Sequence, residues 1–207
     1  MKKMKIMALA LATGLLAVGC SAGTDTASNG GVATAEQIEA ATSELGTDIT
    51  DLKFSLNGTI YQYPFYVQAM LDDGWALDKS VASELETMPA NTISTTFSLE
   101  KKGDSNYGKG RCYGTVSNLT TVDFPIGELE FATLEISKEY GATLILPQGI
   151  TWDSTFDEVV AAYQPSDDRI CDEAEAIYII FTNEENNKHI NLYFDTETRT
   201  LSRVQFH

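Results

Sequence analysis

The sequence predicts an α+β fold: two tandem modules, each a helix plus a three-stranded antiparallel sheet, behind a signal peptide and a flexible tether. Two observations carry most of this prediction. The first twenty residues, MKKMKIMALALATGLLAVGC, combine lysines, an apolar run and a cysteine. Farther along, two segments with helical periodicity begin about 90 residues apart, and each precedes stretches in which apolar and polar residues alternate.

The N-terminus predicts export and lipidation. Three lysines within the first five residues precede an apolar run over residues 6–16, which is too short for a permanent transmembrane helix. The following Ala17-Val18-Gly19-Cys20 resembles the lipobox of bacterial lipoproteins, although that motif prefers leucine where this chain has Ala17. Residues 1–19 are therefore expected to be a signal peptide, with Cys20 acylated and inserted in the cell membrane on its extracytoplasmic side. The alternative is an ordinary secretory signal that happens to precede a cysteine.

The charge balance excludes one class of partner. The signal peptide holds three of the 14 basic residues and none of the 30 acidic ones, which leaves a net charge of −19 in the processed chain. Such a charge repels phosphate backbones and anionic lipid headgroups, so nucleic acid is not expected as a partner. Solubility is the favoured explanation of this charge, and attraction to a cationic partner or to calcium is the alternative.

Residues 20–50 are expected to form the lipidated cysteine and its tether. Residues 21–35, SAGTDTASNGGVATA, contain too little apolar surface to order themselves. A short helix over residues 34–46 is predicted by Thr34 and Gln37, which fit a capping box, and by Gly46 as its end.

The first predicted module covers residues 51–140. Asn57-Gly58 between short alternating runs predicts a hairpin. Pro64 and Gly74 are then expected to begin and end a helix of about ten residues. Three strands follow, in NTISTTFSLEKK, RCYGTVSN and GELEFATLEISKEY, and the third changes phase in a way that predicts a bulge.

The second predicted module covers residues 141–207. Thr155 and Glu158 form a capping-box pattern, and the apolar residues Phe156, Val159, Val160 and Tyr163 recur at helical spacing until Pro165. Three strands are predicted in EAIYIIFTN, HINLYFDT and LSRVQFH, with hairpin turns at NEENNK and TETR.

The phrases LPQGITWDSTFDEVVAAYQPSDD and IYIIFTNEENNKHINLYFDTETRTLSRVQF resemble small exported α/β modules of the SmpA/BamE and β-lactamase-inhibitory-protein type. The resemblance covers roughly residues 54–207, and its motifs are short. It implies a tandem α/β fold that binds other proteins or acts as a scaffold. It brings no catalytic residues. Those modules often carry glycine-proline after the helix, where this chain has Gln164-Pro165.

The sequence offers little catalytic chemistry. It contains two histidines, no Gly-x-Ser-x-Gly elbow and no glycine-rich phosphate loop. Its acidic pairs do not follow calcium-loop spacing, and no cysteine-histidine cluster suits zinc. No enzyme activity, cofactor or metal is therefore predicted.

Two cysteines, Cys112 and Cys171, remain after lipidation of Cys20. An exported pair could form a disulfide that joins the two halves. Two unpaired thiols are the alternative.

The remaining prediction concerns the polar phase of the last strands. Tyr178, Tyr193, Asn191 and His189 are expected on the uncovered face of the second sheet, where tyrosine supplies rigid amphipathic contact area. We therefore predict an anchored protein-binding or scaffold module with an unidentified protein partner. A carbohydrate- or cell-wall-binding lipoprotein, stacking sugars on tyrosines and Trp152, is the alternative, and a hydrolytic enzyme is disfavoured.

Overall fold

The computed structural model describes residues 31–78, 86–103 and 109–207. The predicted signal peptide 1–19 and Cys20 lie outside these residues. The predicted α+β fold of two tandem modules is wrong, because the described residues are mostly β-sheet, with 43% of them in strands and 13 strands in three sheets. The strands predicted to form two separate sheets belong to one sheet.

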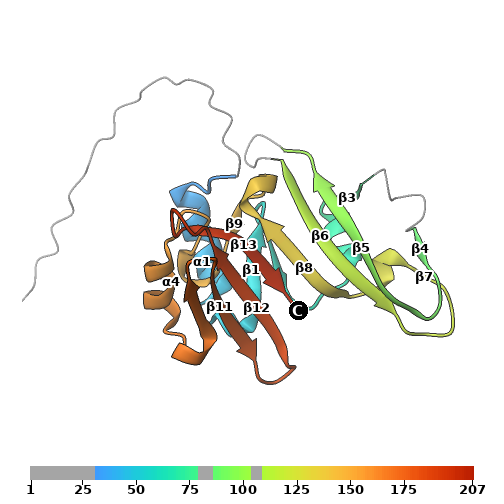
Figure 1. Cartoon of the computed structure of the whole chain (residues 1–207). Coiled ribbons are helices and arrows are strands. Elements are labelled where there is room, and N and C mark those ends of the chain that lie inside the picture. The colour runs from blue at the N-terminus through green and yellow to red at the C-terminus, as the bar shows by residue number, and fades with distance from the viewer. Residues whose placement is uncertain (1–30, 79–85, 104–108) are drawn as a thin grey trace, which may run out of the picture.

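One antiparallel sheet of eight strands organises the molecule (Figure 1). In spatial order its strands are β10 (Ile170–Glu173), β11 (Ala176–Asn183), β12 (Lys188–Phe194), β13 (Leu201–Phe206), β8 (Phe131–Ser137), β6 (Gly110–Asn118), β5 (Thr92–Lys101) and β3 (Ala76–Leu77). The two halves join where β13 pairs with β8, with Val204 opposite Ile136. Pairing these two strands satisfies backbone groups that two separate sheets would each leave exposed at an edge.

The buried face of this sheet carries a row of apolar residues, one from every strand. Register pairs place side by side Ile170, Ile179, Leu192, Val204, Ile136, Cys112, Leu99 and Leu77. The six central members are buried, and the two on the edge strands are partly exposed. This row is the floor of the core, and it follows from the period of two in each strand.

A second sheet lies over part of this floor. It consists of β2 (Thr59–Gln62), β1 (Lys53–Leu56) and β9 (Leu144–Ile145). The predicted hairpin is confirmed, since Asn57 and Gly58 connect β1 to β2 with φ of 48° and 81°. The Phe54 ring lies 4.6 Å from that of Phe206, which joins the two sheets.

Helix α1 (Ala35–Leu45) forms the outer layer on this small sheet. The predicted capping box is confirmed: the Thr34 hydroxyl accepts from the Gln37 N–H, and the Gln37 side chain accepts from the Thr34 N–H. Its buried residues Ala41 and Leu45 pack with Ile145. A segment expected within the tether is thus part of the folded domain.

Helix α2 (Val67–Asp72) has six residues, which corrects the predicted helix of about ten. Pro64 precedes the helix without opening it. The carbonyl of Phe65 accepts from the N–H of Phe131, and the N–H of Val67 donates to the carbonyl of Leu129. These contacts hold the chain extended before the helix can begin.

Helix α4 (Phe156–Tyr163) matches its prediction. Its Thr155–Glu158 capping box is present, and Gln164 in the left-handed conformation ends it before Pro165. Phe156 packs edge-on against Phe194, and Tyr163 packs against Phe181, so α4 covers β11 and β12. The turns that link β11 to β12 and β12 to β13 also lie where the sequence predicts them.

The predicted bulge in the third strand is confirmed, because Thr115 pairs with Thr133 while the next residue, Val116, pairs with Phe131. The remaining elements are short. They are the two-stranded sheet of β4 (Thr87–Met88) and β7 (Phe124–Pro125) and the 3-10 helices η1 (Ile49–Asp51), η2 (Ile126–Glu128), η3 (Lys138–Tyr140), η4 (Pro147–Gly149) and η5 (Asp167–Arg169).

Candidate partner-binding face

The face of the large sheet turned away from the core is the candidate functional site. Helices α2 and α4 and the small sheet pack on the opposite face, and along β11, β12 and β13 every second side chain points away from them. We call this surface the open face and define it by the half-exposed residues Tyr113, Glu135, Tyr178, Ile180, Thr182, His189, Asn191, Tyr193, Arg203 and Gln205.

The structure brings together the two tyrosines that the sequence singled out. Tyr178 and Tyr193 are direct cross-strand partners, and their ring centroids lie 5.7 Å apart at an interplanar angle of 45°. A hydrogen bond with the side chain of Cys171 raises the pKa of Tyr178. The phenol of Tyr178 therefore keeps its proton and remains a hydrogen-bond donor at neutral pH.

Tyr193 lies within a chain of hydrogen bonds that crosses three strands. The Asn191 amide donates to the Tyr193 hydroxyl at 3.4 Å, and that hydroxyl donates to the Gln205 carbonyl oxygen at 3.2 Å. The Gln205 amide donates to the Glu135 carboxylate at 3.2 Å. Asn191, Gln205 and Glu135 are register partners on β12, β13 and β8, so the sheet itself sets the spacing of this chain.

Arg203 completes the arrangement around Tyr193. Its guanidinium lies 4.0 Å from the centroid of the Tyr193 ring, and its Nη1 lies 3.7 Å from the Glu135 carboxylate. A cation over a tyrosine face at this distance is favourable. Hydrogen bonds at one end and a stacked cation over the ring therefore hold Tyr193 in a single orientation.

A second tyrosine pair widens the aromatic surface. Tyr113, opposite Glu135 in the sheet, lies 5.3 Å from Tyr140 of η3 in an edge-to-face arrangement. The open face thus carries tyrosines on both sides of the Glu135–Gln205 contact. The result is a broad surface rather than a single pocket.

The end of the open face nearest the β12–β13 turn is hollowed. A shallow depression of about 750 Å³ has the tyrosine pair and Arg203 as its floor, with charged and polar groups around them. The charged residues that line it are Lys138, Glu139, Glu175, Asp195 and Arg203. Both signs of charge are present, so the hollow suits a partner surface of mixed charge.

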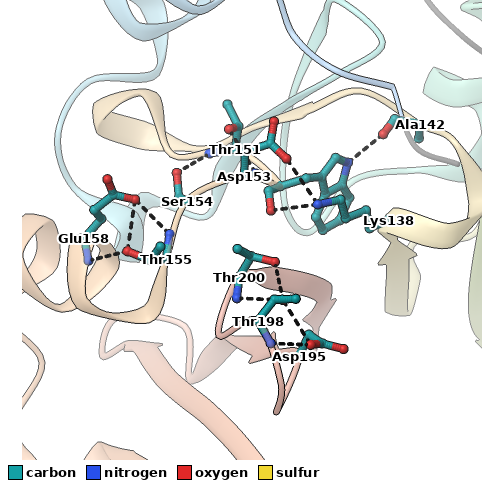
Figure 2. A network of polar contacts seen from close by, with 11 residues as sticks. Lys138, Ala142, Thr151, Asp153, Ser154, Thr155, Glu158, Asp195, Thr198 and Thr200 are labelled. Atoms are coloured by element: carbon teal, nitrogen blue, oxygen red, sulfur yellow. Dashed lines mark hydrogen bonds and ion pairs between the residues drawn. The ribbon is translucent and has the colours of Figure 1, made fainter. Parts of the chain in front are cut away.

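A network of hydrogen bonds links the residues at the rim of this hollow (Figure 2). The Asp195 carboxylate accepts from the N–H of Thr198 at 2.8 Å and from its hydroxyl at 3.0 Å, and these bonds lower the pKa of Asp195. The Thr198 hydroxyl also lies 2.9 Å from that of Thr200. These hydrogen bonds stabilise the turn.

Backbone contacts tie this rim to helix α4. The N–H of Phe156 donates to the carbonyl of Arg199 at 2.8 Å, and the N–H of Leu201 donates to the carbonyl of Ser154 at 2.9 Å. On the other side of the hollow, Lys138 donates to the Asp153 carboxylate at 3.2 Å, as Figure 2 shows. The buried Trp152 donates its indole N–H to the carbonyl of Ala142 at 2.7 Å.

His189 lies on the same strand phase as Asn191 and Tyr193, beyond the hollow. Its ring stacks on His207 with centroids 4.7 Å apart and an interplanar angle of 13°. The Nε2 atom of His207 is buried and finds no partner among the described residues. All four residues predicted for the partner site thus share the open face, but only the two tyrosines line the hollow.

The two cysteines are not brought together. Cys112 is buried on β6, Cys171 is partly exposed on the edge strand β10, and both are free. Five strand-to-strand steps separate β10 from β6, which amounts to roughly 24 Å. A disulfide requires Cα atoms within about 7 Å. Burial raises the pKa of the Cys112 thiol, so it behaves as an apolar core residue.

The three residues that surround Tyr193 in this arrangement, Arg203, Gln205 and Glu135, were missed from the sequence. The alternation of LSRVQFH already places Arg203 and Gln205 on the phase opposite to Val204 and Phe206. That signal could have found both. Glu135 could not be predicted from the sequence, because its position beside Gln205 depends on the pairing of β8 with β13.

Two general properties complete the description. Within the described ranges, no three side chains of His, Cys, Asp or Glu come together in a group that could hold a metal ion. No helix of the described part has the length and apolar character needed to cross a membrane.

Comparison with known proteins adds no relative. No family model matches the chain, no curated protein is similar to it, and no solved structure matches its fold.

Proposed function

We propose that this chain is an exported lipoprotein, anchored through acylated Cys20, whose folded domain binds a protein partner through the open face without catalysing a reaction. The observation that carries the proposal is the Tyr178–Tyr193 pair, held by Arg203 and the Asn191–Gln205–Glu135 hydrogen bonds on a broad, shallow surface. Tyrosine and arginine dominate binding energy at protein interfaces. Side chains already fixed in one orientation lose little conformational entropy on binding.

The carbohydrate alternative has less support. Trp152, which would stack on sugars, is 3% exposed and uses its indole N–H within the core, and Trp75 is 2% exposed. The guanidinium of Arg203 lies over the Tyr193 ring. A sugar would have to displace this cation before it could stack on that side of the ring.

A hydrolytic role also has less support. Catalysis requires convergent groups in a cavity that excludes water, whereas the hollow on the open face is shallow. Among its carboxylates, Asp195 is held by a structural partner, since it accepts from the N–H of Thr198.

Substituting the tyrosine pair tests the partner site. We expect Tyr178→Ser with Tyr193→Ser to lower partner recovery by about tenfold or more, since each residue is a candidate hot spot. The measurement is pull-down from cell-surface extract with protein lacking residues 1–20, followed by mass spectrometry. Tyr66→Ser is the matched control, because Tyr66 is the most exposed described tyrosine and lies outside the open face. Unchanged recovery by a double variant with an intact circular dichroism spectrum would refute the proposed site.

The anchor has its own test. Cys20→Ser removes the thiol that accepts the diacylglycerol, and we expect the substituted chain to leave the detergent phase in a phase-partition assay. Cys171→Ser is the control, since it removes a partly exposed thiol elsewhere. Retention of the Cys20→Ser protein in the detergent phase would show that the lipobox interpretation is wrong.

A further inference from the structure

The basic residues of this acidic protein are unevenly distributed. The described residues include ten lysines and arginines, and four of them line one open hollow of about 1100 Å³ at the end of the β5–β6 hairpin: Lys101, Lys102, Lys109 and Arg111. The whole chain carries a net charge of −16. A local cationic surface on such a chain attracts an anionic surface that the rest of the molecule repels.

The lysines, rather than the arginine, are available to a ligand. Arg111 forms an ion pair with Glu100 and lies 3.9 Å from Asp78, so its charge is largely compensated. Lys101 lies over the Trp75 ring at 5.9 Å. Lys102 and Lys109 are exposed, and neither forms an ion pair with another described residue.

This hollow is close to the point where the chain from Cys20 enters the domain. Gly31 packs against Gly141 and Thr143 so closely that an added Cβ would lie 2.9 Å from the Gly141 carbonyl oxygen. Gly141 in turn packs against Lys109, since a Cβ on it would lie 2.8 Å from the Lys109 carbonyl oxygen. Gly31, where the chain enters the domain, and Lys109 of the cationic hollow therefore both pack against Gly141.

The length of chain between the anchor and this point is short. Eleven residues lead from Cys20 to Gly31, and they can span at most about 40 Å. A tether of this length raises the effective concentration of the cationic surface at the membrane to roughly millimolar. A weak attraction that could not bind a free protein to the membrane is then sufficient to dock the anchored domain.

We propose that Lys101, Lys102 and Lys109 dock the anchored domain onto anionic phospholipid headgroups of the membrane that holds Cys20. The inference rests on the lipid anchor of the proposed function and adds an orientation to it. A basic residue near an anionic bilayer contributes about 1 kcal/mol to the free energy of membrane binding. Charges farther from the bilayer than a Debye length of about 8 Å contribute little to it.

Asp78 and Glu100 line the same hollow, and Arg111 compensates one of these two carboxylates, so the described residues that line the hollow keep a net charge of +2. Acidic residues farther away on the domain oppose docking only weakly. The tyrosine pair on β11 and β12 lies at least three strands away from this end of the sheet, whereas Tyr140 of the second tyrosine pair lines the cationic hollow.

The test compares the full-length acylated protein in two kinds of vesicle, phosphatidylcholine alone and phosphatidylcholine with about 30 mol% phosphatidylglycerol. Hydrogen–deuterium exchange is measured on peptides from residues 99–112. We expect slower exchange on the anionic vesicles, and we expect about 0.5 M salt to remove the difference.

Variants locate the effect. Lys102→Gln with Lys109→Gln is expected to lower the ratio of docked to undocked protein about 30-fold, the equivalent of about 2 kcal/mol. Lys53→Gln with Arg169→Gln removes the same charge elsewhere and is expected to leave the protection unchanged. Equal exchange on both vesicles, or equal loss with both pairs, overturns the docking while leaving the anchor and the partner site intact. Failure of the wild-type protein to float with either vesicle overturns the anchor, and the docking with it.

Discussion

Tyr193 shows what the sequence can predict about a single residue. The alternation of HINLYFDT places it on the polar side of a strand together with His189 and Asn191, and the structure bears this out. The cation over its ring could not be predicted, because Arg203 reaches it across a strand pair whose register shifts between Tyr193 and Phe194. Phase along a strand is local information, whereas contact across strands requires the register.

The stacked histidines give a prediction at the same scale. Burial lowers the pKa of His189, assisted by Lys188 and Arg169, and burial also lowers the pKa of His207, assisted by His189. Both rings therefore take up protons less readily in the folded state than in the unfolded chain, where histidine has its ordinary pKa of 6.5. Stability is complete above that pH and falls as the pH decreases through it.

We expect the urea midpoint of the wild-type protein to fall between about pH 7.5 and about pH 5.5. His189→Gln should reduce this dependence, because it removes one titrating ring and a neighbour of the other. Carboxylates such as Asp172, whose pKa Arg199 lowers, lose their contribution only at more acidic pH. An equal pH dependence in the variant and the wild type would exclude the histidine pair as its source.

At the scale of elements, helix α4 is the best-predicted part of the chain. Its capping box fixes the first turn, and the pKa of Glu158 is lowered by the hydrogen bonds from Thr155. Its apolar face covers β11 and β12, with Val159 fully buried and Phe156 7% exposed. Local sequence and tertiary packing favour the same structure here, which is why the sequence alone was sufficient to predict α4.

Substitutions in α4 should separate the contribution of its buried face from that of its capping box. Phe156→Ala is expected to cost about 3–5 kcal/mol because it leaves a cavity against Phe194. Thr155→Ala should cost about 1 kcal/mol through loss of the cap. Ala161→Ser, on the exposed side, is the control and should change little. Denaturant unfolding measures all three, and a Phe156→Ala midpoint equal to the wild type would show that α4 does not cover the core.

Helix α2 marks the limit of prediction for elements. Pro64 and Gly74 flank the helix as predicted. However, the backbone of Phe65 is hydrogen-bonded to Phe131, and the backbone of Val67 is hydrogen-bonded to Leu129. These partners lie more than 60 residues away in the sequence. A long-range pairing therefore shortened a helix that local rules would have extended.

At the scale of the whole molecule, the sequence predicted most strands but not how they join. Nothing in GELEFATLEISKEY or LSRVQFH shows that these segments are neighbours, yet their pairing turns two expected sheets into one. The same pairing brings Glu135 beside Gln205 and Arg203. The open face is therefore a property of the whole sheet, although four of its residues could be named in advance.

The claim that this face contacts a protein partner is tested most directly by site-specific photocrosslinking in living cells. A photoreactive amino acid replaces Ile180, between the tyrosine pair and Thr182 on the open face, or Asp157, whose side chain is 89% exposed on helix α4. We predict a discrete protein adduct from position 180, lost when Tyr193→Ser is added, and none from position 157. An adduct from position 157 with none from position 180 would contradict it.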